Sequence, residues 1–301
     1  MNILNHLRNL KQKCINFIFV HFPKLMSDEQ YLTVLYRYAM GKEMNWKNPQ
    51  TFNEKLQWLK VHNRKPEYTV MVDKYLVKKY VAEKIGEEYV IPSLGVWDRV
   101  EDIDFDALPD QFVLKCTHDS GGIVICKDKS KLDRQAAIEK LSKGLKSNYF
   151  LRNREWPYKN VKPRIIGEPY MCDVNDELND FKWFCFDGKP HVMFIATDRF
   201  NVQEETKFDF YDMDFRHLPF TNGHPNATCQ IEKPQTFEKM KSLAEKLSAG
   251  IPHVRVDFYD VDGRIYFGEL TFFHWSGLTP FSPEEWDYTL GSWIKLPQKT
   301  N

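Results

Sequence analysis

Two short segments constrain the fold of this 301-residue chain more than any other feature. In the first, residues 112–125, an apolar strand ends near Lys115, and a loop of small residues leads into a second strand. In the second, residues 254–271, apolar residues alternate around a turn at residues 260–263. This pattern predicts a β-hairpin that carries two carboxylates. A cation beside a flexible loop suits polyphosphate, and paired carboxylates suit Mg²⁺. Together the segments predict an ATP-dependent enzyme.

Each segment also has an ordinary structural explanation. Residues 120–122 would let backbone N–H groups approach phosphate oxygens, but no Gly-Lys-Ser/Thr sequence follows, so the loop is not a Walker A loop. Lys115 is equally compatible with a surface lysine before a hairpin turn. Asp257 and Glu269 are equally compatible with an ion pair to Arg255 or another base.

Composition narrows the class of protein. Hydrophobic residues make up 42% of the chain, which is enough to form a core. The 42 basic and 42 acidic residues cancel, so the overall charge gives no reason to expect a nucleic-acid partner. None of the 6 cysteines forms a CxxC pair or a zinc-spaced cluster, which predicts free thiols in a reducing cytoplasm.

Residues 8–22 combine basic side chains with an apolar run that is too short to span a bilayer. No small-x-small cleavage site follows, so we expect a helix of the mature protein. That helix either packs against the core or contacts the membrane surface peripherally. The predicted location is cytoplasmic, with association to the inner face of the membrane as the second possibility.

Helices and hairpins interleave along the chain, which favours an α+β fold over a doubly wound sheet. Capping patterns predict helices that begin after Ser27 and after Thr51. Apolar spacing predicts further helices over residues 73–85, 133–149 and 236–250. The predicted extended segments cover residues 90–92, 94–97, 161–171, 181–186, 191–197 and 208–215.

A second hairpin, turned at Asp187 and Gly188, would bring two further cations together. Lys182 and Arg199 would then lie on paired strands or at their ends. Such a pair can clamp a γ-phosphate or an acyl phosphate. Ordinary solvated charges are the alternative.

The order of these parts is more specific than any one of them. Asp73 and Lys74 open a helix, Ile91-Pro92 follows, and then come Lys115 with its loop, Glu168, Asp180 with Lys182, Arg199, Asp257 and Glu269. This order, with the closing sequence at residues 277–288, resembles the TupA-like ATP-grasp family, which is associated with teichuronopeptide and capsular polysaccharide synthesis. The resemblance covers roughly residues 50–297.

The resemblance implies an ATP-grasp fold with a helical N-terminal region at residues 1–65. Residues 66–165 would form the N-terminal and central part with the phosphate loop. Residues 166–301 would form the C-terminal part with the metal-binding hairpin.

The resemblance also implies a role for each matching residue. Lys74 would begin the nucleotide-side helix, and Lys115 would touch the α- and β-phosphates of ATP. The remaining nucleotide contacts would be a mobile loop of Ser120, Gly121 and Gly122, an adenine edge at Glu168, Pro169 and Tyr170, and Asp180 near the ribose.

Catalysis and metal binding would fall to the C-terminal part. Lys182 and Arg199 would address the transferred phosphoryl group or the acyl intermediate. Asp257 and Glu269 would hold Mg²⁺, which makes Glu269 both a metal ligand and a catalytic residue.

Two positions depart from the family pattern. Thr271 stands where ATP-grasp enzymes commonly have Asn, and its hydroxyl would be a weaker ligand for Mg²⁺. Asp119 places an anion within the proposed phosphate loop, so its carboxylate is expected to point away from the phosphates or towards a metal.

The implied reaction joins a carboxylate to an amine. Mg-ATP would phosphorylate the carboxylate, and the amine would attack the acyl phosphate to form an amide. The implied substrates are a glycan or sugar nucleotide that contains a uronic acid, and an amine donor such as an amino acid. Residues 272–275 would stack on a sugar ring or pack in the core. His274 would act as the base for the amine or serve as a packed, hydrogen-bonded histidine.

Three other functions remain open at this point. The patterns Asp212-Met213-Asp214 and Asp260-Val261-Asp262 have the DxD form of a glycosyltransferase metal site. A sugar kinase would use the same phosphate-binding parts with a hydroxyl acceptor. A non-catalytic nucleotide-binding or polysaccharide-assembly protein would use the carboxylate pair structurally.

Overall fold

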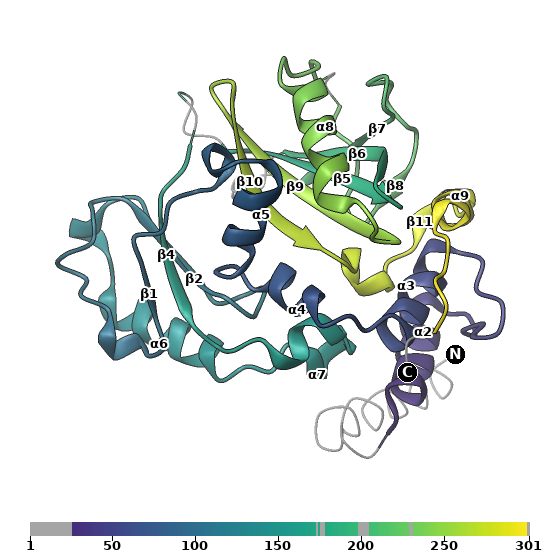
Figure 1. Ribbon diagram of the computed structural model, residues 1–301, viewed down its shortest axis with the longest axis horizontal. Coiled ribbons are helices and arrows are strands. Elements are labelled where there is room, and N and C mark those ends of the chain that lie inside the picture. The colour runs from purple at the N-terminus through teal and green to yellow at the C-terminus, as the bar shows by residue number, and fades with distance from the viewer. Residues whose placement is uncertain (1–25, 173, 175–177, 198–204, 229–230, 300–301) are drawn as a thin grey trace, which may run out of the picture.

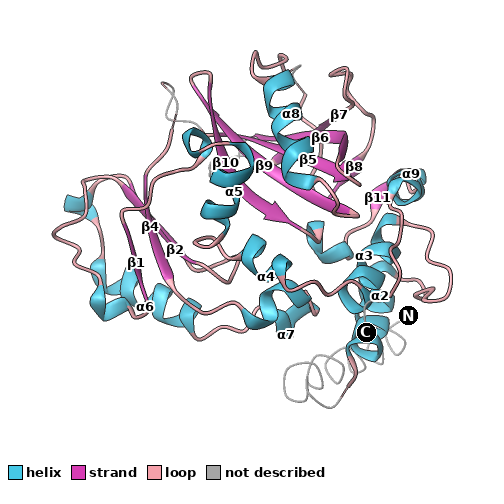
Figure 2. Ribbon diagram, viewed as in Figure 1, coloured by secondary structure: helices cyan, strands magenta, loops and turns pink. Residues whose placement is uncertain are grey.

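The computed structural model describes residues 26–172, 174, 178–197, 205–228 and 231–299. The helix expected over residues 8–22, and Arg199, lie outside these residues. Within them, helices combine with antiparallel sheets, as the α+β prediction requires (Figures 1 and 2). No helix in this part of the chain is long and apolar enough to cross a membrane.

Two capped helices open the described chain. α2 (Asp28–Met40) begins after Ser27, whose hydroxyl accepts from the Gln30 amide while the Gln30 side chain accepts from the Ser27 amide. α3 (Phe52–His62) begins after Thr51 with the same reciprocal arrangement. These bonds satisfy N–H groups that the first turn of a helix leaves unpaired. Both predicted helix starts are confirmed.

α4 (Glu67–Val72) and α5 (Val77–Ile85) occupy the region around the helix predicted over residues 73–85. The Asp73 carboxylate accepts from the amides of the second and third residues that follow it, at 2.9 and 3.2 Å. Aspartate favours such a turn because its side chain competes for backbone N–H groups. The predicted helix start at Asp73 is therefore wrong, and α5 begins only at Val77.

A four-stranded antiparallel sheet holds the lysine strand. Helix α6 (Arg134–Leu145) packs against it, and the short helix α7 (Phe150–Asn153) follows. The strand of this sheet that comes last in the sequence, β4, crosses the boundary predicted after residue 165. The division of the chain into three regions stays a prediction. The strand order is β1 (Gly95–Trp97), β4 (Ile165–Pro169), β2 (Phe112–Cys116) and β3 (Ile123–Cys126).

A five-stranded antiparallel sheet holds both predicted hairpins. The turns at Asp187-Gly188 and Asp262-Gly263 have φ values of 50° and 80°, and of 52° and 83°. Positive φ at both central residues is what a type I′ hairpin turn requires. The strand order is β10 (Arg264–Thr271), β9 (His253–Val261), β5 (Asn179–Phe186), β6 (Lys189–Thr197) and β7 (Lys207–Tyr211).

The larger sheet has two different faces because its side chains alternate. On one face, Trp183 is fully buried with its ring centroid 4.9 Å from that of Phe237 in α8 (Phe237–Ser248). Burying a side chain as large as Phe237 contributes about 2 kcal/mol to folding. Lys182, the strand neighbour of Trp183, therefore points to the opposite face, which carries the site described below.

The C-terminal residues pack against the N-terminal helices, as Figure 1 shows at the lower right. Lys55 of α3 donates to two carbonyl groups at the end of α9 (Glu285–Trp293), at 2.7 and 2.9 Å. A two-stranded sheet of β8 (Thr221–Asn222) and β11 (Phe281–Ser282) lies beside α9. Short 3₁₀ helices are η1 (Glu87–Tyr89), η2 (Val100–Asp102), η3 (Lys129–Lys131), η4 (Trp156–Asn160) and η5 (His274–Gly277).

Candidate active site

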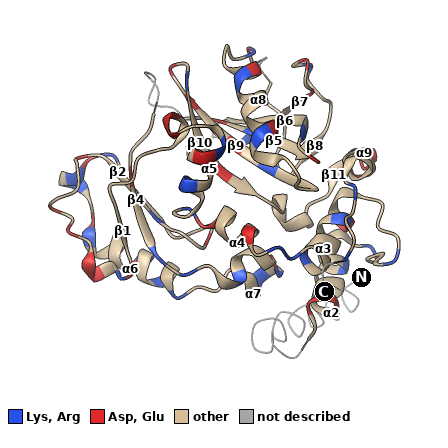
Figure 3. Cartoon of the chain, viewed as in Figure 1, with Lys and Arg blue, Asp and Glu red and all other residues tan. Residues whose placement is uncertain are grey.

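A cavity of about 510 Å³ opens between the two sheets. Strands β2, β3 and β4, helix α5, and strands β5, β9 and β10 all contribute to its wall, and Figure 3 shows both signs of charge on α5 and on the strands near it. Its volume is typical of small-molecule sites. The predicted site residues that line it are Lys74, Lys115, Ser120, Gly121, Gly122, Glu168, Pro169, Tyr170, Asp180, Lys182, Asp257 and Glu269.

The smaller sheet contributes a carboxylate held between two lysines. Glu168 accepts from Lys115 Nζ at 2.7 Å and, through its other oxygen, from Lys78 Nζ at 2.5 Å. Burial alone would raise the pKa of Glu168, but the charges of Lys115 and Lys78 outweigh it and hold this pKa below its usual range. Glu168 thus orients Lys115 at the cavity wall, and its expected contact with adenine stays a prediction.

Lys78 lines the cavity but was not identified from the sequence. The sequence alone did not single it out, because the adjacent Lys79 is an equal candidate and only the packing of α5 decides which lysine faces the cavity. Lys78 Nζ also donates to the Ile91 carbonyl at 2.6 Å. The edge strand predicted at residues 90–92 is absent from the described chain, since this carbonyl bonds to a side chain and Pro92 has no N–H to donate.

The loop between β2 and β3 is held by its own aspartate. The Asp119 carboxylate accepts from the Gly122 amide at 3.1 Å and from the Gly121 amide at 3.4 Å. Lys74 Nζ donates to the Asp119 carbonyl at 2.5 Å. Burial lowers the pKa of Lys74, while Glu269 and Asp119 act against this shift. The loop amides expected to meet phosphate therefore bond to Asp119 in this structure, and a phosphate would have to replace that carboxylate.

One side of this loop packs tightly and the other is open. A Cβ atom added to Gly144 of α6 would lie 3.2 Å from Gly122 Cα, so glycine at residue 144 permits the close approach of helix and loop. Ser147, just after α6, donates to the Asp119 carboxylate at 3.4 Å. A Cβ atom added to Gly121 would meet nothing within 4 Å. The loop is thus anchored at Gly122 and accessible at Gly121.

The larger sheet contributes a row of charged side chains. Glu269 lies directly opposite Asp257 across the β9–β10 hairpin, and Lys182 lies opposite Asp257 on β5. A β-bulge between Phe267 and Glu269 shifts the register so that the two carboxylates face each other. Lys182 Nζ lies 2.5 Å from Asp257 Oδ2 and 2.6 Å from Asp180 Oδ2. Two neighbouring strands, β5 and β9, thus place one ammonium group between two acids.

Arg255 links the two carboxylates of the hairpin. Its Nη2 lies 2.7 Å from Asp257 Oδ2 and 3.0 Å from both Glu269 Oε1 and Thr271 Oγ1. Thr271 Oγ1 donates to Glu269 Oε1 at 2.9 Å. Burial would raise the pKa of Glu269, but Arg255, Lys182 and Lys74 lower it to about 2. The ion pair considered as the ordinary explanation is therefore present. Arg255 was not assigned to the site, although its spacing from Asp257 puts both on one strand face.

His274 positions Arg255. Its Nδ1 lies 2.8 Å from a guanidinium nitrogen of Arg255, and its Nε2 lies 2.9 Å from Asn222 Oδ1. A guanidinium group only donates, so Nδ1 accepts and Nε2 carries the hydrogen. Burial and the charge of Arg255 keep the pKa of His274 well below its usual value. With both nitrogens engaged, His274 does not fit the hypothesis that it is the base for the amine.

This fold and this cavity correspond to a known family. The family model described as TupA-like ATPgrasp matches residues 54–295. The chain belongs to the TupA-like ATP-grasp family. The match spans both sheets and all the residues around the cavity, and it confirms the resemblance and the ATP-grasp fold predicted from the sequence.

Solved structures similar to this TupA-like ATP-grasp protein include three ligases. The D-alanine–D-alanine ligase from Bacillus anthracis complexed with ATP is 14% identical, with 89% of this chain and 75% of that chain covered and a TM-score of 0.41. The D-alanine–D-alanine ligase from Helicobacter pylori is 13% identical, with 81% and 69% covered and a TM-score of 0.44. The ATP-grasp ligase PsnB, complexed with minimal precursor, Mg and ADP, is 14% identical, with 73% and 57% covered and a TM-score of 0.40. The chain thus spans little more than half the length of PsnB. No curated protein sequence matches the chain.

The oxygen donors of this TupA-like ATP-grasp protein fit magnesium. Oxygens of Asp257 and Glu269 converge within 3.0 Å of one nitrogen of Arg255, so a single cation can be shared between them. Among the described residues, no three His, Cys, Asp or Glu side chains form a metal-binding group. Magnesium nevertheless needs only one or two carboxylates when substrate phosphates complete its coordination. Thr271 lies beside Glu269 but does not line the cavity, and its role as a ligand stays a prediction.

The two DxD patterns form turns outside the cavity. Asp212 accepts from the amides of Asp214 and Arg216 at 2.9 and 2.8 Å. Asp260 accepts from the Gly263 amide at 2.8 Å. These carboxylates stabilise local turns, and neither pattern contributes to the cavity that holds Asp257 and Glu269.

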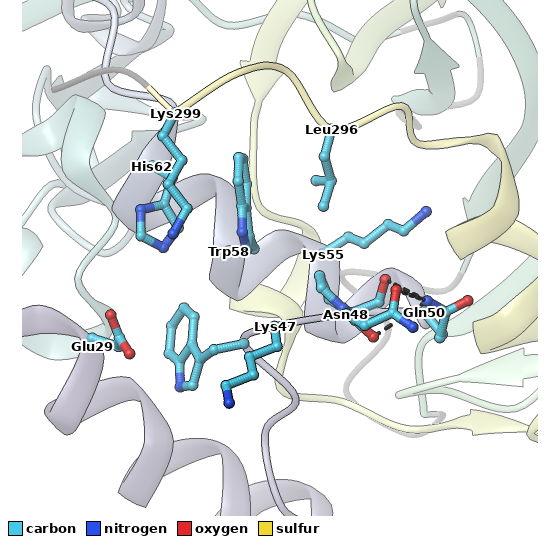
Figure 4. Close-up of a pocket in the computed structure, with 11 residues that line it drawn as sticks. Glu29, Lys47, Asn48, Gln50, Lys55, Trp58, His62, Leu296 and Lys299 are labelled. Carbon is cyan, nitrogen blue, oxygen red and sulfur yellow. Dashed lines mark hydrogen bonds between the residues drawn. The ribbon is translucent and has the colours of Figure 1, made fainter.

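A second cavity, of about 690 Å³, lies beside α3 and apart from the two sheets. Figure 4 shows Trp58, His62, Lys55 and Glu29 around it. It has neither paired carboxylates nor a glycine loop, and Lys55 is already bonded to the end of α9. This second cavity therefore lacks the groups that nucleotide chemistry needs.

Proposed function

We propose that this protein is an ATP-dependent carboxylate–amine ligase that attaches an amine, such as an amino acid, to a uronic acid of a surface polysaccharide or its sugar-nucleotide precursor. One observation carries the proposal. In a TupA-like ATP-grasp fold, one cavity brings Lys74, Lys115 and Lys182 together with the opposed carboxylates of Asp257 and Glu269. Cations for phosphates and oxygen ligands for Mg²⁺ are the two requirements of Mg-ATP chemistry.

The proposed reaction has two steps. A carboxylate oxygen of the uronic acid attacks the γ-phosphorus of ATP, the bond to the bridging oxygen breaks, and ADP leaves. The amine nitrogen then attacks the carbonyl carbon of the acyl phosphate. The carbon–oxygen bond to phosphate breaks, the nitrogen loses a proton, and an amide and inorganic phosphate remain.

The cavity residues serve this reaction by charge and by exclusion of water. Lys115 and Lys74 line the cavity and would bind the phosphates of ATP. Lys182, which lies beside Asp257, would stabilise the charge that develops during transfer. Magnesium held by Asp257 and Glu269 would neutralise phosphate charge when bound. Apolar side chains in the cavity wall, such as that of Val113, would limit the access of water. Water would otherwise hydrolyse the acyl phosphate.

Hydroxylamine trapping tests the proposal directly. With ATP, Mg²⁺ and a panel of uronic acids, hydroxylamine should capture the acyl phosphate as a hydroxamate while ADP is released. A sugar kinase would release ADP with a stable phosphorylated sugar and no hydroxamate. A glycosyltransferase would consume a sugar nucleotide without ATP, and either result would overturn the ligase proposal.

A further inference from the structure

The second cavity, beside α3, brings the two ends of the described chain together. Its wall combines Glu29 of α2, residues 46–50 between α2 and α3, one face of α3, and Leu296 and Lys299 beyond α9. Its volume of about 690 Å³ exceeds the 510 Å³ of the cavity between the sheets. Of the described residues, none lines both cavities. The second cavity is therefore large enough for a small molecule and separate from the nucleotide site.

Hydrogen bonds hold the wall of this cavity in place. Trp46 Nε1 donates to Thr33 Oγ1 at 2.7 Å. The side-chain amide of Gln50 donates to Asn48 Oδ1 at 2.6 Å, one of the dashed lines in Figure 4. Lys55 fixes the opposite side through its two bonds to the end of α9. A wall that is already ordered loses little conformational freedom when a ligand binds.

Aromatic rings form one part of the wall. The ring centroid of His62 lies 4.8 Å from that of Trp58 and 6.2 Å from that of Trp46. Trp46 is only half-buried, although its ring is fixed by the bond to Thr33. Indole rings combine a large apolar face with a polar N–H group. This part of the cavity thus suits a ligand that carries a ring with an apolar face.

The rest of the wall carries an excess of positive charge, with three lysines against one glutamate. Lys47 and Lys299 are exposed, and neither ammonium group has a hydrogen bond or ion pair within the part of the chain that the structure describes. Trp58 is only 6% exposed, yet its indole N–H has no acceptor among the described residues. Buried donors are normally paired, so an acceptor on a ligand is the missing partner.

The neighbouring histidine responds to this charge. Burial lowers the pKa of His62, and the charge of Lys299 lowers it further, with Glu29 opposing this shift and Arg64 adding to it. Figure 4 shows the Lys299 side chain extending beside the His62 ring. The positive charges thus outweigh the negative one at this point of the cavity, and an anion placed there would be stabilised.

Two separate ammonium groups suit a phosphate better than a carboxylate. A phosphate monoester carries about two negative charges at neutral pH, whereas a carboxylate carries one. Lysine binds phosphate as a point charge, whereas the planar fork of arginine matches a carboxylate. The Glu29 carboxylate and the Asn48 amide add an acceptor and a donor, which are the partners that hydroxyl groups need.

We infer that the second cavity is a binding site for a hexose phosphate. Lys47 and Lys299 bind the phosphate group, Trp46 and Trp58 contact the sugar ring, and Glu29 accepts from a ring hydroxyl. The inference goes beyond the proposed function, because that function concerns only the cavity between the two sheets.

Isothermal titration of the full chain tests the inference. The probe is glucose 6-phosphate, added in the presence of saturating Mg-ADP so that the cavity between the sheets is occupied. Two comparison ligands separate the parts of the site. Inorganic phosphate lacks the ring, and glucose 6-sulfate has the ring but a single charge, so each should bind about tenfold more weakly. Equal affinity for either comparison ligand, or no binding of glucose 6-phosphate, would overturn the inference.

Lysine variants show where the ligand binds. Lys47→Gln and Lys299→Gln should each weaken glucose 6-phosphate binding by about tenfold, the scale of a hydrogen bond to a charged group. Both side chains are exposed, so neither change should affect thermal unfolding. The control is Lys79→Gln on α5, where the side chain is 86% exposed and lines neither cavity. Wild-type affinity in either cavity variant would overturn the inference.

An NMR titration of His62 gives a second readout at the site itself. The His62→Asn variant identifies the signal, because that signal alone disappears. Bound glucose 6-phosphate should raise the pKa of His62, because a phosphate dianion favours the charged imidazole ring and opposes the effect of Lys299. An unchanged pKa of His62 in the presence of bound ligand would place the ligand elsewhere and overturn the inference.

Discussion

Arg255 contacts Glu269 across the β9–β10 hairpin, with Nη2 lying 3.0 Å from Oε1. The guanidinium group is buried, whereas the Glu269 side chain is 44% exposed. The same guanidinium group also binds Asp257, whose side chain is only 1% exposed. Arg255 thus joins one carboxylate that is widely exposed to one that lines the cavity but is almost fully covered. Changes at these residues should therefore have different effects on folding and on nucleotide binding.

Removal of the guanidinium group should destabilise the fold. Burial raises the pKa of Asp257, so Arg255→Ala leaves an anion whose charge the interior disfavours. Breaking a buried pair in this way costs about 3–5 kcal/mol. Urea unfolding at neutral pH measures the loss. Arg264→Ala, at the exposed end of β10, should cost less than about 1 kcal/mol, and equal losses in both variants would contradict the argument.

Glu269→Gln should separate nucleotide binding from stability. The exposed half of this side chain faces the cavity, so its charge matters for Mg²⁺ more than for packing. We expect a loss of about tenfold or more in Mg²⁺-dependent binding of a fluorescent ATP analogue, with little change in thermal unfolding. The control is Glu238→Gln, where the side chain is 67% exposed and pairs only with surface groups. Unchanged Mg²⁺ dependence in Glu269→Gln would remove Glu269 from the metal site.

Local features of this chain could be predicted from its sequence. The caps at Ser27 and Thr51, and the turn at Asp187-Gly188, each depend on residues within four positions of one another. Hairpin register follows from such turns, so the placement of Asp257 and Glu269 on neighbouring strands was foreseeable. Their direct opposition was not, because the turn alone would place Gly268 opposite Asp257 and only the β-bulge brings Glu269 there.

Contacts between distant segments were harder to foresee. Lys78 meets Glu168 only because α5 packs near β4, and the two residues are 90 positions apart. Asp119 could point towards phosphate or away from it, and the choice depends on amides within its own loop. Asp73 has both turn and helix propensity, and the turn prevails because its carboxylate finds two N–H groups.

Lys115→Ala should weaken ATP binding more than Lys78→Ala. Both lysines bond to Glu168, but the Lys115 side chain is 22% exposed at the cavity wall and that of Lys78 is 14% exposed. We expect a loss of about tenfold for Lys115→Ala and a smaller one for Lys78→Ala, measured by isothermal titration. A double variant should lose less than the sum, because both act through one carboxylate. Strict additivity would argue against a shared role of Glu168.

Asp119 should hold the phosphate loop by hydrogen bonding rather than by charge. Asp119→Asn keeps an oxygen that accepts from the Gly121 and Gly122 amides, whereas Asp119→Ala leaves both unpaired. The alanine variant should therefore lose about 1–3 kcal/mol of stability and the asparagine variant much less. The asparagine variant should also bind ATP more tightly than wild type, because its weaker acceptor is more easily replaced by phosphate. Tighter binding is measured by titration, and equal stability of the two variants would contradict this account.

Stability should fall as pH decreases below about 6.5, because His253 stays neutral in the folded protein. Burial lowers the pKa of His253 to about 3. The unfolded chain binds a proton at this residue near its ordinary pKa of about 6.5, so below that pH the unfolded state gains protons that the folded state does not. Between about pH 6.5 and pH 3, such a histidine should lower the free energy of unfolding by about 1.4 kcal/mol for each pH unit of acidification.

Urea unfolding at pH 7, 6 and 5 measures this dependence. In His253→Phe, the free energy of unfolding should fall with pH less steeply than in wild type, by about that amount per pH unit. The ring would pack among Phe52, Phe184 and Phe186, which already surround His253. His217→Asn, whose side chain is 43% exposed, serves as the control, and the same slope in wild type and His253→Phe would contradict the assignment.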